Sequence, residues 1–309
     1  MSTLIDILKK SEEFLRRKDI CNARFEAECL LTKALRCRRI DLYLRYMAKL
    51  NDRQLDAIRV LLTCRAKREP LQYIMGEWPF HELTINVDKR ALIPRPETEE
   101  LAEILIKKFS THKNAALDIL ELGTGSGALA LTLAKYFLRS RVCASDCSRA
   151  ALSLARENGA RNMTRNVVFV ESDWFSSIAG AFDLIVSNPP YLSEEEWAQT
   201  QPEIKFFEPK AALCAADGGK ADLLKIIDQA PKFLKPNGVL ALETGEAHHQ
   251  ATFEFAKERF QFSESLKDQS LRSRFLILSH PGGEFCNLIG CKGLQLLDGE
   301  APLSQELAN

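Results

Sequence analysis

Strand and helix patterns alternate through residues 116–280, which leaves few folds open to this part of the chain. Short apolar runs typical of buried strands are separated by segments with apolar residues at helical spacing. The expected strands are 117–122, 142–145, 167–170, 182–186, 239–242 and 275–278, and the expected helices are 128–137, 150–158 and 221–234. Repeated strand–helix–strand units form right-handed crossovers. The sequence therefore predicts an α/β fold with a doubly wound, mostly parallel, Rossmann-like sheet.

The part of the chain before this alternation has another pattern. Apolar residues recur at helical spacing through the first 70 residues, with glycine and proline nearly absent, so we expect a small helical bundle at 1–70. Residues 71–95 alternate around turn residues, which predicts a β-hairpin linker. A helix should begin at Pro96, because proline is tolerated in a first turn. We expect the α/β domain at 96–280 and a tail without clear periodicity at 281–309.

Length and composition narrow the class of protein. With 309 residues the chain fits about two domains of ~150 residues. No run approaches the ~18 apolar residues that cross a membrane, and the polar start has no signal-peptide core. Nine cysteines without a C-x-x-C pair indicate reduced thiols, and the five histidines lack metal-ligand spacing. We therefore expect a cytoplasmic monomer with no metal site and no membrane association.

The net charge is zero but unevenly distributed. Residues 1–75 contain 17 Lys and Arg against 10 Asp and Glu, so they carry +7 and the remainder carries −7. A basic amino-terminal part would suit an acidic partner or a nucleic-acid-rich assembly. Solvated helix faces that are simply basic would give the same count, so the charge alone leaves both interpretations open.

A glycine-rich segment joins the expected strand 117–122 to the helix that follows. It reads Glu121-Leu122-Gly123-Thr124-Gly125-Ser126-Gly127. Glycine permits a tight turn and a close backbone approach to a ligand, and a helix N-terminus offers free N–H groups. The spacing is G-x-G-x-G, not the G-x-G-x-x-G of dinucleotide-binding folds. It resembles the first motif of S-adenosylmethionine-dependent methyltransferases, which makes Gly123, Thr124, Gly125, Ser126 and Gly127 candidate cofactor-binding residues.

Two further candidates follow later strands. Asp146 ends the second strand, 19 positions after Gly127, where an acidic side chain of a Rossmann-like half accepts hydrogen bonds from ribose hydroxyls. It could instead cap the next helix, and one aspartate can do both. Trp174 follows the third strand, where its ring could flank an adenine or pack into the core.

The tetrad Asn188-Pro189-Pro190-Tyr191 directly follows the expected strand 182–186. Proline fixes its own φ and restricts the residue before it, so three successive residues have little freedom. The carboxyl end of a strand is where open α/β sheets bind ligands. The Asn188 side-chain oxygen and the Pro189 carbonyl could each accept one hydrogen of a planar NH2 group, with Tyr191 packed on that group. The alternative is that the prolines only mark a loop.

Together these segments resemble the bacterial-type release factor glutamine methyltransferases, which methylate the glutamine side-chain nitrogen in the Gly-Gly-Gln loop of peptide chain release factors. The resemblance covers about residues 1–280. It rests on 92–99, 121–127, Asp146, 172–174, 188–191 and 207–209 with Ala212-Leu213 after it. One departure is Leu271, which stands between Asp268 and Arg274 where the family commonly has glycine, and it indicates a reshaped loop.

The resemblance implies residue roles. S-adenosylmethionine would be the cofactor, with S-adenosylhomocysteine as product, and the residues lining it would be Gly123 to Gly127, Asp146, Trp174 and Asn188. The glutamine would be held by Asn188, Pro189, Pro190 and Tyr191, with Asn188, Pro189 and Tyr191 acting in catalysis. Since no obvious general base stands beside the tetrad, we expect no deprotonation before methyl transfer.

Two other functions stay open. The tetrad also occurs in amino-directed DNA or RNA methyltransferases, acting on adenine N6 or guanine N2. Such an enzyme would need a flipped base and a basic channel, whereas the part with the tetrad carries −7, so we expect no stable nucleic-acid binding. The second alternative is a non-catalytic cofactor-binding protein that works through its basic bundle, which an intact glycine loop and tetrad disfavour.

Overall fold

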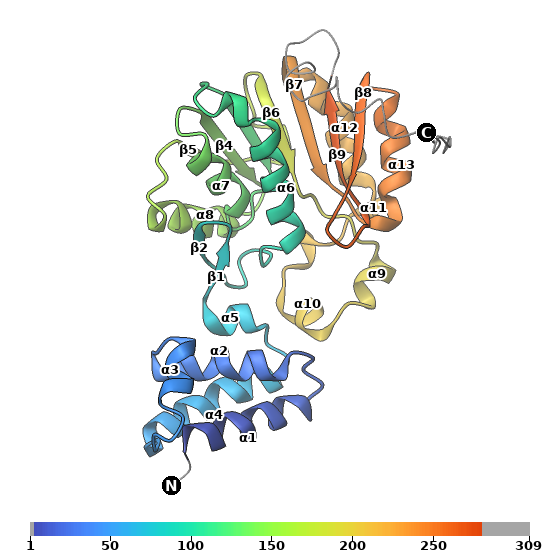
Figure 1. The fold of residues 1–309 in the computed structure, drawn as a ribbon. Coiled ribbons are helices and arrows are strands. Elements are labelled where there is room, and N and C mark those ends of the chain that lie inside the picture. The colour runs from blue at the N-terminus through green and yellow to red at the C-terminus, as the bar shows by residue number, and fades with distance from the viewer. Residues whose placement is uncertain (1–2, 280–309) are drawn as a thin grey trace, which may run out of the picture.

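Helices with buried apolar faces pack together at the start of the chain (Figure 1). The computed structural model describes residues 3–279. Thr3 and Asn51 cap the first and fourth helices, each by accepting a backbone N–H three residues further on. Leu8, Leu30 and Leu31 belong to the buried core between them. The helices are α1 Leu4–Arg16, α2 Ala23–Leu35, α3 Arg39–Leu44, α4 Asp52–Ala66 and α5 Leu71–Met75.

An antiparallel hairpin follows, formed by β1 Glu77–Phe80 and β2 Leu83–Asn86. It lies within the residues expected to form a hairpin linker, although α5 occupies the first five of them. The hairpin packs its buried residues, such as Ile85, against α7 (Ala128–Tyr136). Helix α6 (Pro96–Lys108) begins at Pro96, as predicted.

The main sheet has seven strands within the described residues, in the order β5-β4-β3-β6-β7-β9-β8. The strands β5, β4, β3, β6 and β7 pair in parallel, whereas β9 is antiparallel to β7 and β8. This confirms the predicted α/β fold with a doubly wound, mostly parallel sheet. The strands are β3 Asp118–Leu122, β4 Arg141–Asp146, β5 Val167–Glu171, β6 Phe182–Ser187, β7 Leu234–Glu243, β8 Phe262–Lys267 and β9 Ser273–Ser279.

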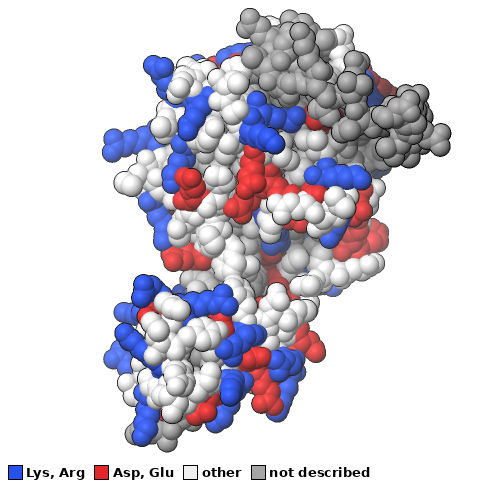
Figure 2. Space-filling view, viewed as in Figure 1, with Lys and Arg blue, Asp and Glu red and all other residues white. Residues whose placement is uncertain are grey.

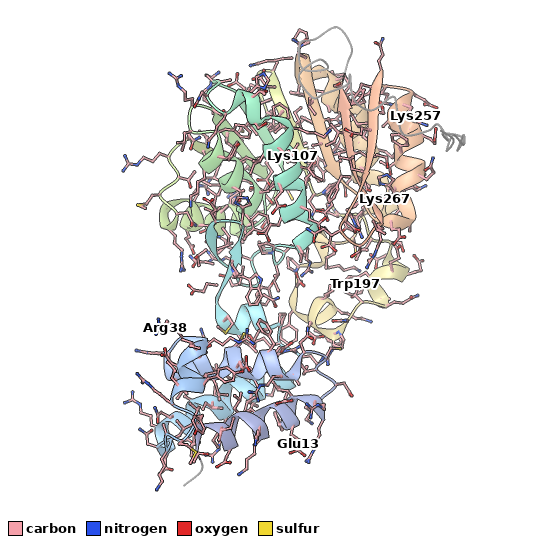
Figure 3. The ribbon with its side chains drawn as sticks, viewed as in Figure 1. Glu13, Arg38, Lys107, Trp197, Lys257 and Lys267 are labelled. Carbon is pink, nitrogen blue, oxygen red and sulfur yellow. The ribbon has the colours of Figure 1, made fainter. Side chains whose placement is uncertain are left out.

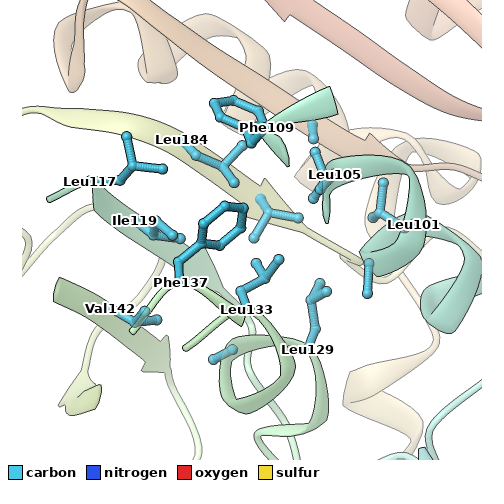
Figure 4. Close-up of a cluster of buried hydrophobic side chains, with 14 of the residues drawn as sticks. Leu101, Leu105, Phe109, Leu117, Ile119, Leu129, Leu133, Phe137, Val142 and Leu184 are labelled. Atoms are coloured by element: carbon cyan, nitrogen blue, oxygen red, sulfur yellow. The ribbon is translucent and has the colours of Figure 1, made fainter. Parts of the chain in front are cut away.

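Helices cover both faces of the sheet because alternate residues of each strand face opposite sides. On one face, Ile119 and Leu184 pack against α6 and α7, as Figure 4 shows. On the other face, Leu120 and Ile185 pack against α12 (Ala221–Gln229) and α13 (Glu246–Lys257). Helix α8 (Arg149–Arg161) contacts β4 and β5. Burial on both faces explains why the central strands β3 and β6 read as continuous apolar runs.

Several elements near the end of the sheet differ from the sequence-based expectation. Strand β7 begins at Leu234, so the expected helix stop at 236–238 lies inside the strand, where its register against β6 shifts. The helix expected to reach 234 ends at Gln229, and a short 3-10 turn follows it. Helix α13 and strand β8 had not been predicted. The tail expected at 281–309 lies outside the described residues. No helix formed by residues 3–279 has both the length and the apolar character to cross a bilayer.

The segment between β6 and α12 returns to the bundle (Figure 1). Glu203 on this segment pairs with Arg65 of α4 and with Arg68 just after that helix, at 2.9 and 2.8 Å. Arg65 is only 5% exposed and also pairs with Glu26. Figure 3 shows Trp197 on the same segment, between the bundle and the sheet. The helices of the segment are α9 Glu194–Ala198, α10 Pro202–Phe207 and α11 Ala216–Gly219.

We predict that Glu203→Gln destabilises the protein, because it removes one counter-charge from the buried Arg65 guanidinium. The expected loss is about 1–3 kcal/mol, seen as a lower midpoint in thermal unfolding followed by circular dichroism. Glu195→Gln, on an exposed position of α9, is the matched control and should leave the midpoint unchanged. Identical midpoints for the two variants would contradict a stabilising ion cluster.

Candidate active site

The glycine loop between β3 and α7 has a backbone conformation that favours glycine. Gly123, Gly125 and Gly127 have φ values of +71°, +55° and +85°. Gly127 is the N-cap residue of α7. The Thr124 N–H donates to the Ser145 carbonyl of β4 at 2.8 Å, which holds the loop close to the neighbouring strand end.

Glu121 ties this loop to α7. Its Oε2 accepts hydrogen bonds from the Thr124 hydroxyl and from the Ala130 N–H, the second at 3.1 Å. Burial raises the pKa of Glu121 to about 8. Glu121 had no role of its own among the sequence-based predictions, because its importance depends on contacts that only the folded loop creates.

Asp146 joins the end of β4 to the glycine loop. Its Oδ2 accepts the Gly125 N–H and its Oδ1 accepts the Ser148 N–H, both at 2.8 Å. Ser148 is the N-cap of α8 and accepts the Ala151 N–H, so capping of that helix falls to the serine. Burial raises the pKa of Asp146, against the lowering by its two N–H bonds. Each carboxylate oxygen keeps a lone pair for a ligand hydroxyl.

Trp174 packs into the core, and the contact with an adenine stays a prediction. Its ring packs against the buried cluster under α12 and also lines the cavity described below. The indole Nε1 donates to Asp222 Oδ1 at 3.1 Å, which fixes the orientation of the ring. A Cβ placed on Gly123 would lie 3.7 Å from this ring, so the loop and the indole face each other across a narrow gap.

A cavity of about 370 Å³ lies at the carboxyl edge of the parallel strands. Its size is within the range of small-molecule sites, and its position matches the ligand-binding edge of open α/β sheets. Its charged lining is mainly acidic, with Arg90 as the basic member. The lining residues are Arg90, Ala91, Leu92, Gly123, Gly125, Asp146, Cys147, Ser148, Ala151, Ser172, Asp173, Trp174, Asn188, Pro190, Pro209, Ala211, Ala212 and Asp222.

The cavity brings together part of the predicted site. Its lining includes the predicted residues Gly123, Gly125, Asp146, Trp174, Asn188 and Pro190. The remaining predicted residues do not line it. Thr124 and Ser126 are buried behind the loop, and Pro189 is buried between its neighbours. Tyr191 lines an adjoining cavity of about 380 Å³, with Glu196, Glu246 and Arg274.

The tetrad is held from behind by two residues from distant parts of the chain. Asn188 Nδ2 donates to Thr98 Oγ1 of α6 at 2.9 Å, and Thr98 Oγ1 donates to Glu243 Oε2 at 2.7 Å. The Tyr191 hydroxyl donates to Glu243 Oε1 at 3.3 Å. Burial raises the pKa of both Glu243, to about 7, and Tyr191. Glu243 was not predicted, and Thr98 was noted only within the stretch 92–99.

Glu208 connects two of the segments that carried the family resemblance. This buried carboxylate accepts the Ile93 N–H at 3.1 Å and an Arg95 N–H at 2.7 Å. The residues around Ile93 and those around Pro209 both line the cavity, so the contact closes one side of it. Sequence spacing gives no sign of this contact, because Glu208 lies 113 positions after Arg95.

Comparison with known proteins agrees with this architecture. Residues 6–76 match the family described as PrmC N-terminal domain, and residues 96–222 match the one described as Methyltransferase small domain. The release factor glutamine methyltransferase of Chlorobaculum tepidum is 39% identical over 250 residues, covering 78% of this chain and 85% of its own. Its counterpart in Geobacter sulfurreducens is 39% identical, covering 79% and 84%.

Two more similarities complete the comparison. The release factor glutamine methyltransferase of Lactococcus lactis is 41% identical over 212 residues, covering 69% of this chain and 77% of its own. Among solved structures, a methyltransferase from Pyrococcus furiosus is similar over 65% of this chain and 90% of its own, with 20% identity and a TM-score of 0.47.

We predict that Asp146→Ala weakens binding of S-adenosylmethionine at least about tenfold, since it frees the Gly125 N–H and removes an acceptor from the cavity. Titration calorimetry measures the dissociation constant. Glu171→Ala is the matched control, because Glu171 is the exposed register partner of Asp146 on β5. Unchanged affinity in Asp146→Ala would remove Asp146 from the cofactor site.

Proposed function

The chain belongs to the release factor glutamine methyltransferases, and we propose that it methylates the side-chain amide nitrogen of the glutamine in the Gly-Gly-Gln loop of class 1 peptide chain release factors. It is an S-adenosylmethionine-dependent methyltransferase, and the proposed reaction would act in translation termination in the cytoplasm. One observation carries the proposal: a proline-stiffened amide, Asn188, lines the cavity while its NH2 end is anchored behind it by Thr98.

The cavity suits the cofactor in size and in chemistry. Gly123 leaves room beside the Trp174 ring and Gly125 beside Ala91, and Asp146 offers carboxylate oxygens for ribose hydroxyls. Asp146, Asp173 and Asp222 together give an acidic lining, which favours a cationic ligand. When bound, the cofactor supplies a sulfonium methyl group as the electrophile. The chain would hold it through Gly123 to Gly127, Asp146, Trp174 and Asn188.

The tetrad would make a poor nucleophile reactive. An amide nitrogen is weakly nucleophilic because its lone pair is delocalised into the carbonyl group. Asn188 Oδ1 and the Pro189 carbonyl would each accept a hydrogen bond from one N–H of this nitrogen. These bonds would raise the electron density on the nitrogen and orient it toward the cavity. Such acceptors strengthen as positive charge develops on nitrogen, so they stabilise the transition state more than the ground state. Tyr191 would pack on the planar amide and exclude water.

Proton removal before methyl transfer is not part of this proposal. The methylated nitrogen would carry a positive charge and would lose its surplus proton to water after the transfer. Glu243 is the carboxylate that hydrogen-bonds to the tetrad, through Tyr191. Both of its oxygens are already acceptors, one for the Thr98 hydroxyl and one for the Tyr191 hydroxyl. It does not line the cavity. Alignment of the nitrogen at roughly 3–3.5 Å from the reacting carbon would add to the effect of the two acceptors and supply much of the rate enhancement.

The bundle would provide a second contact with the release factor, because a Gly-Gly-Gln loop offers little area for recognition. Figure 2 shows Lys and Arg spread over the bundle, and residues 1–75 carry +7. Ile40, Leu44 and Met47 add exposed apolar side chains on and just after α3. A basic and apolar surface of this kind suits an acidic protein partner. We expect the enzyme to act as a monomer.

An amino-directed nucleic-acid methyltransferase fits the cavity less well. A nucleotide substrate brings phosphates, and the charged lining here is mainly aspartate. The proposed grip on a planar NH2 group would suit both chemistries, so the electrostatics and the family distinguish between them. We expect no stable nucleic-acid binding.

We predict that Asn188→Ala lowers turnover at least about a hundredfold, because one of the two acceptors for the amide hydrogens is lost. The measurement is transfer of labelled methyl from S-adenosylmethionine to a Gly-Gly-Gln peptide. Cofactor affinity should change by only a few fold, and Asn114→Ala, at an exposed position, should behave as wild type. Comparable turnover in Asn188→Ala would reject the proposed grip.

The bundle surface makes a separate prediction. Leu44→Glu should raise the apparent KM for an intact release factor several fold, since it puts a charge into the apolar contact, and should leave the KM for a short Gly-Gly-Gln peptide unchanged. Leu138→Glu, an equally exposed leucine on the α/β part, is the control. A parallel rise for factor and peptide would argue against a second binding surface.

A further inference from the structure

We infer that Glu243 is a positioning residue, which acts through Thr98 to fix which end of the Asn188 amide faces the substrate. This inference rests on the proposed function, because it assumes that Asn188 Oδ1 receives a hydrogen of the substrate amide. Glu243 is 1% exposed and does not line the cavity, so its effect on the reaction has to pass through the residues that it contacts.

The direction of the hydrogen bonds carries the argument. An ionised carboxylate only accepts, so the Thr98 hydroxyl has to donate its single hydrogen to Glu243 Oε2. The Thr98 oxygen is then left with lone pairs alone and can only accept. The group that meets it at 2.9 Å must therefore be a donor, which is Asn188 Nδ2. The acceptor end, Oδ1, is consequently the end left for the substrate.

The polarity matters because the two ends of a carboxamide have nearly the same shape and opposite chemistry. A rotated Asn188 would present an NH2 group to the NH2 group of the glutamine. Two donors cannot satisfy each other, so the grip would be lost although Asn188 stayed in place. Proline rings on the following two residues restrict the backbone, but they leave this side-chain rotation free.

Glu243 also aligns the other side of the tetrad. Its Oε1 accepts from the Tyr191 hydroxyl, so one carboxylate holds both the amide and the ring that are proposed to enclose the glutamine. Glu243 is the last residue of β7, which neighbours β6, the strand that leads into the tetrad. The strand pairing therefore sets the position of the carboxylate relative to Asn188 and Tyr191.

Protonation of Glu243 would reverse the direction of the hydrogen bonds that run from Asn188 through Thr98 to Glu243. A protonated carboxyl can donate to Thr98, whose own hydrogen could then turn to Asn188 Oδ1. Burial and then the nearby Glu97 of α6 raise the pKa of Glu243 to about 7, against the hydrogen bond from Thr98, the charge of Arg274 of β9 and the Tyr191 hydroxyl. A raised pKa means that the carboxyl is neutral below about pH 7 and ionised above it. The reversed orientation of the Asn188 amide is thus expected below about pH 7.

The first test distinguishes the effect of the Thr98 hydroxyl from the effect of the shape of the Thr98 side chain. Thr98→Val should lower kcat about tenfold or more with little change in cofactor affinity, since the Asn188 amide loses the acceptor that orients it. Thr98→Ser should restore most of this loss. Thr111→Val, at an exposed threonine, is the control and should retain full activity. A wild-type kcat in Thr98→Val would overturn the inference.

The second test measures how kcat depends on pH. A merely structural role of Glu243 would not produce the pH dependence expected here. The wild-type kcat should rise as pH increases through about 7, whereas Thr98→Val and Glu243→Gln should both give a low kcat without this rise. The same rise in Thr98→Val would overturn the inference even if Glu243→Gln failed to fold. The two proposals can fail separately: active Asn188→Ala refutes the grip itself, whereas inactive Asn188→Ala with fully active Thr98→Val refutes only the role of Glu243.

Discussion

Buried carboxylates at the carboxyl edge of the sheet hold the site together. Glu121, Glu208 and Glu243 are buried and Asp146 is half-buried, and each accepts hydrogen bonds from backbone N–H groups or hydroxyls on another element. A buried carboxylate costs free energy unless such donors surround it, so each acid favours one position of the loop that supplies them. The loops around the cavity are thereby fixed before any ligand arrives, which is the condition for electrostatic preorganisation.

The acidic lining of the cavity also distinguishes between the classes of ligand that could bind there. Asp146, Asp173 and Asp222 would attract a sulfonium cation and repel the phosphates of a nucleic acid. The net positive charge belongs instead to the bundle, since residues 1–75 carry +7 and the remainder carries −7. The molecule therefore separates an acidic cavity, which we propose as the cofactor site, from a basic bundle, which we propose as the docking surface.

Local patterns in the sequence were enough to predict much of this structure. The apolar runs located the parallel strands, and the glycine loop was recognisable because left-handed φ values require glycine at fixed positions. Strand β8 escaped prediction because it is a half-exposed edge strand with polar residues, and 236–238 was misread because a bulge in β7 uses the same residues as a turn. Glu243 could not be found from the sequence, since its contact with Thr98 spans 145 positions and leaves no periodicity.

The pairing of Glu203 with Arg65 and Arg68 has a consequence for selectivity. Because these partly buried charges fasten the bundle to the segment that follows the tetrad, the distance between the bundle surface and Asn188 is set by the fold. The bundle surface and the tetrad are thus held at one separation. If the bundle is the second contact that we propose, a protein would be modified only when its glutamine and its second epitope are separated by the matching span. Size selection would then depend on an ion cluster that contacts neither methyl donor nor acceptor.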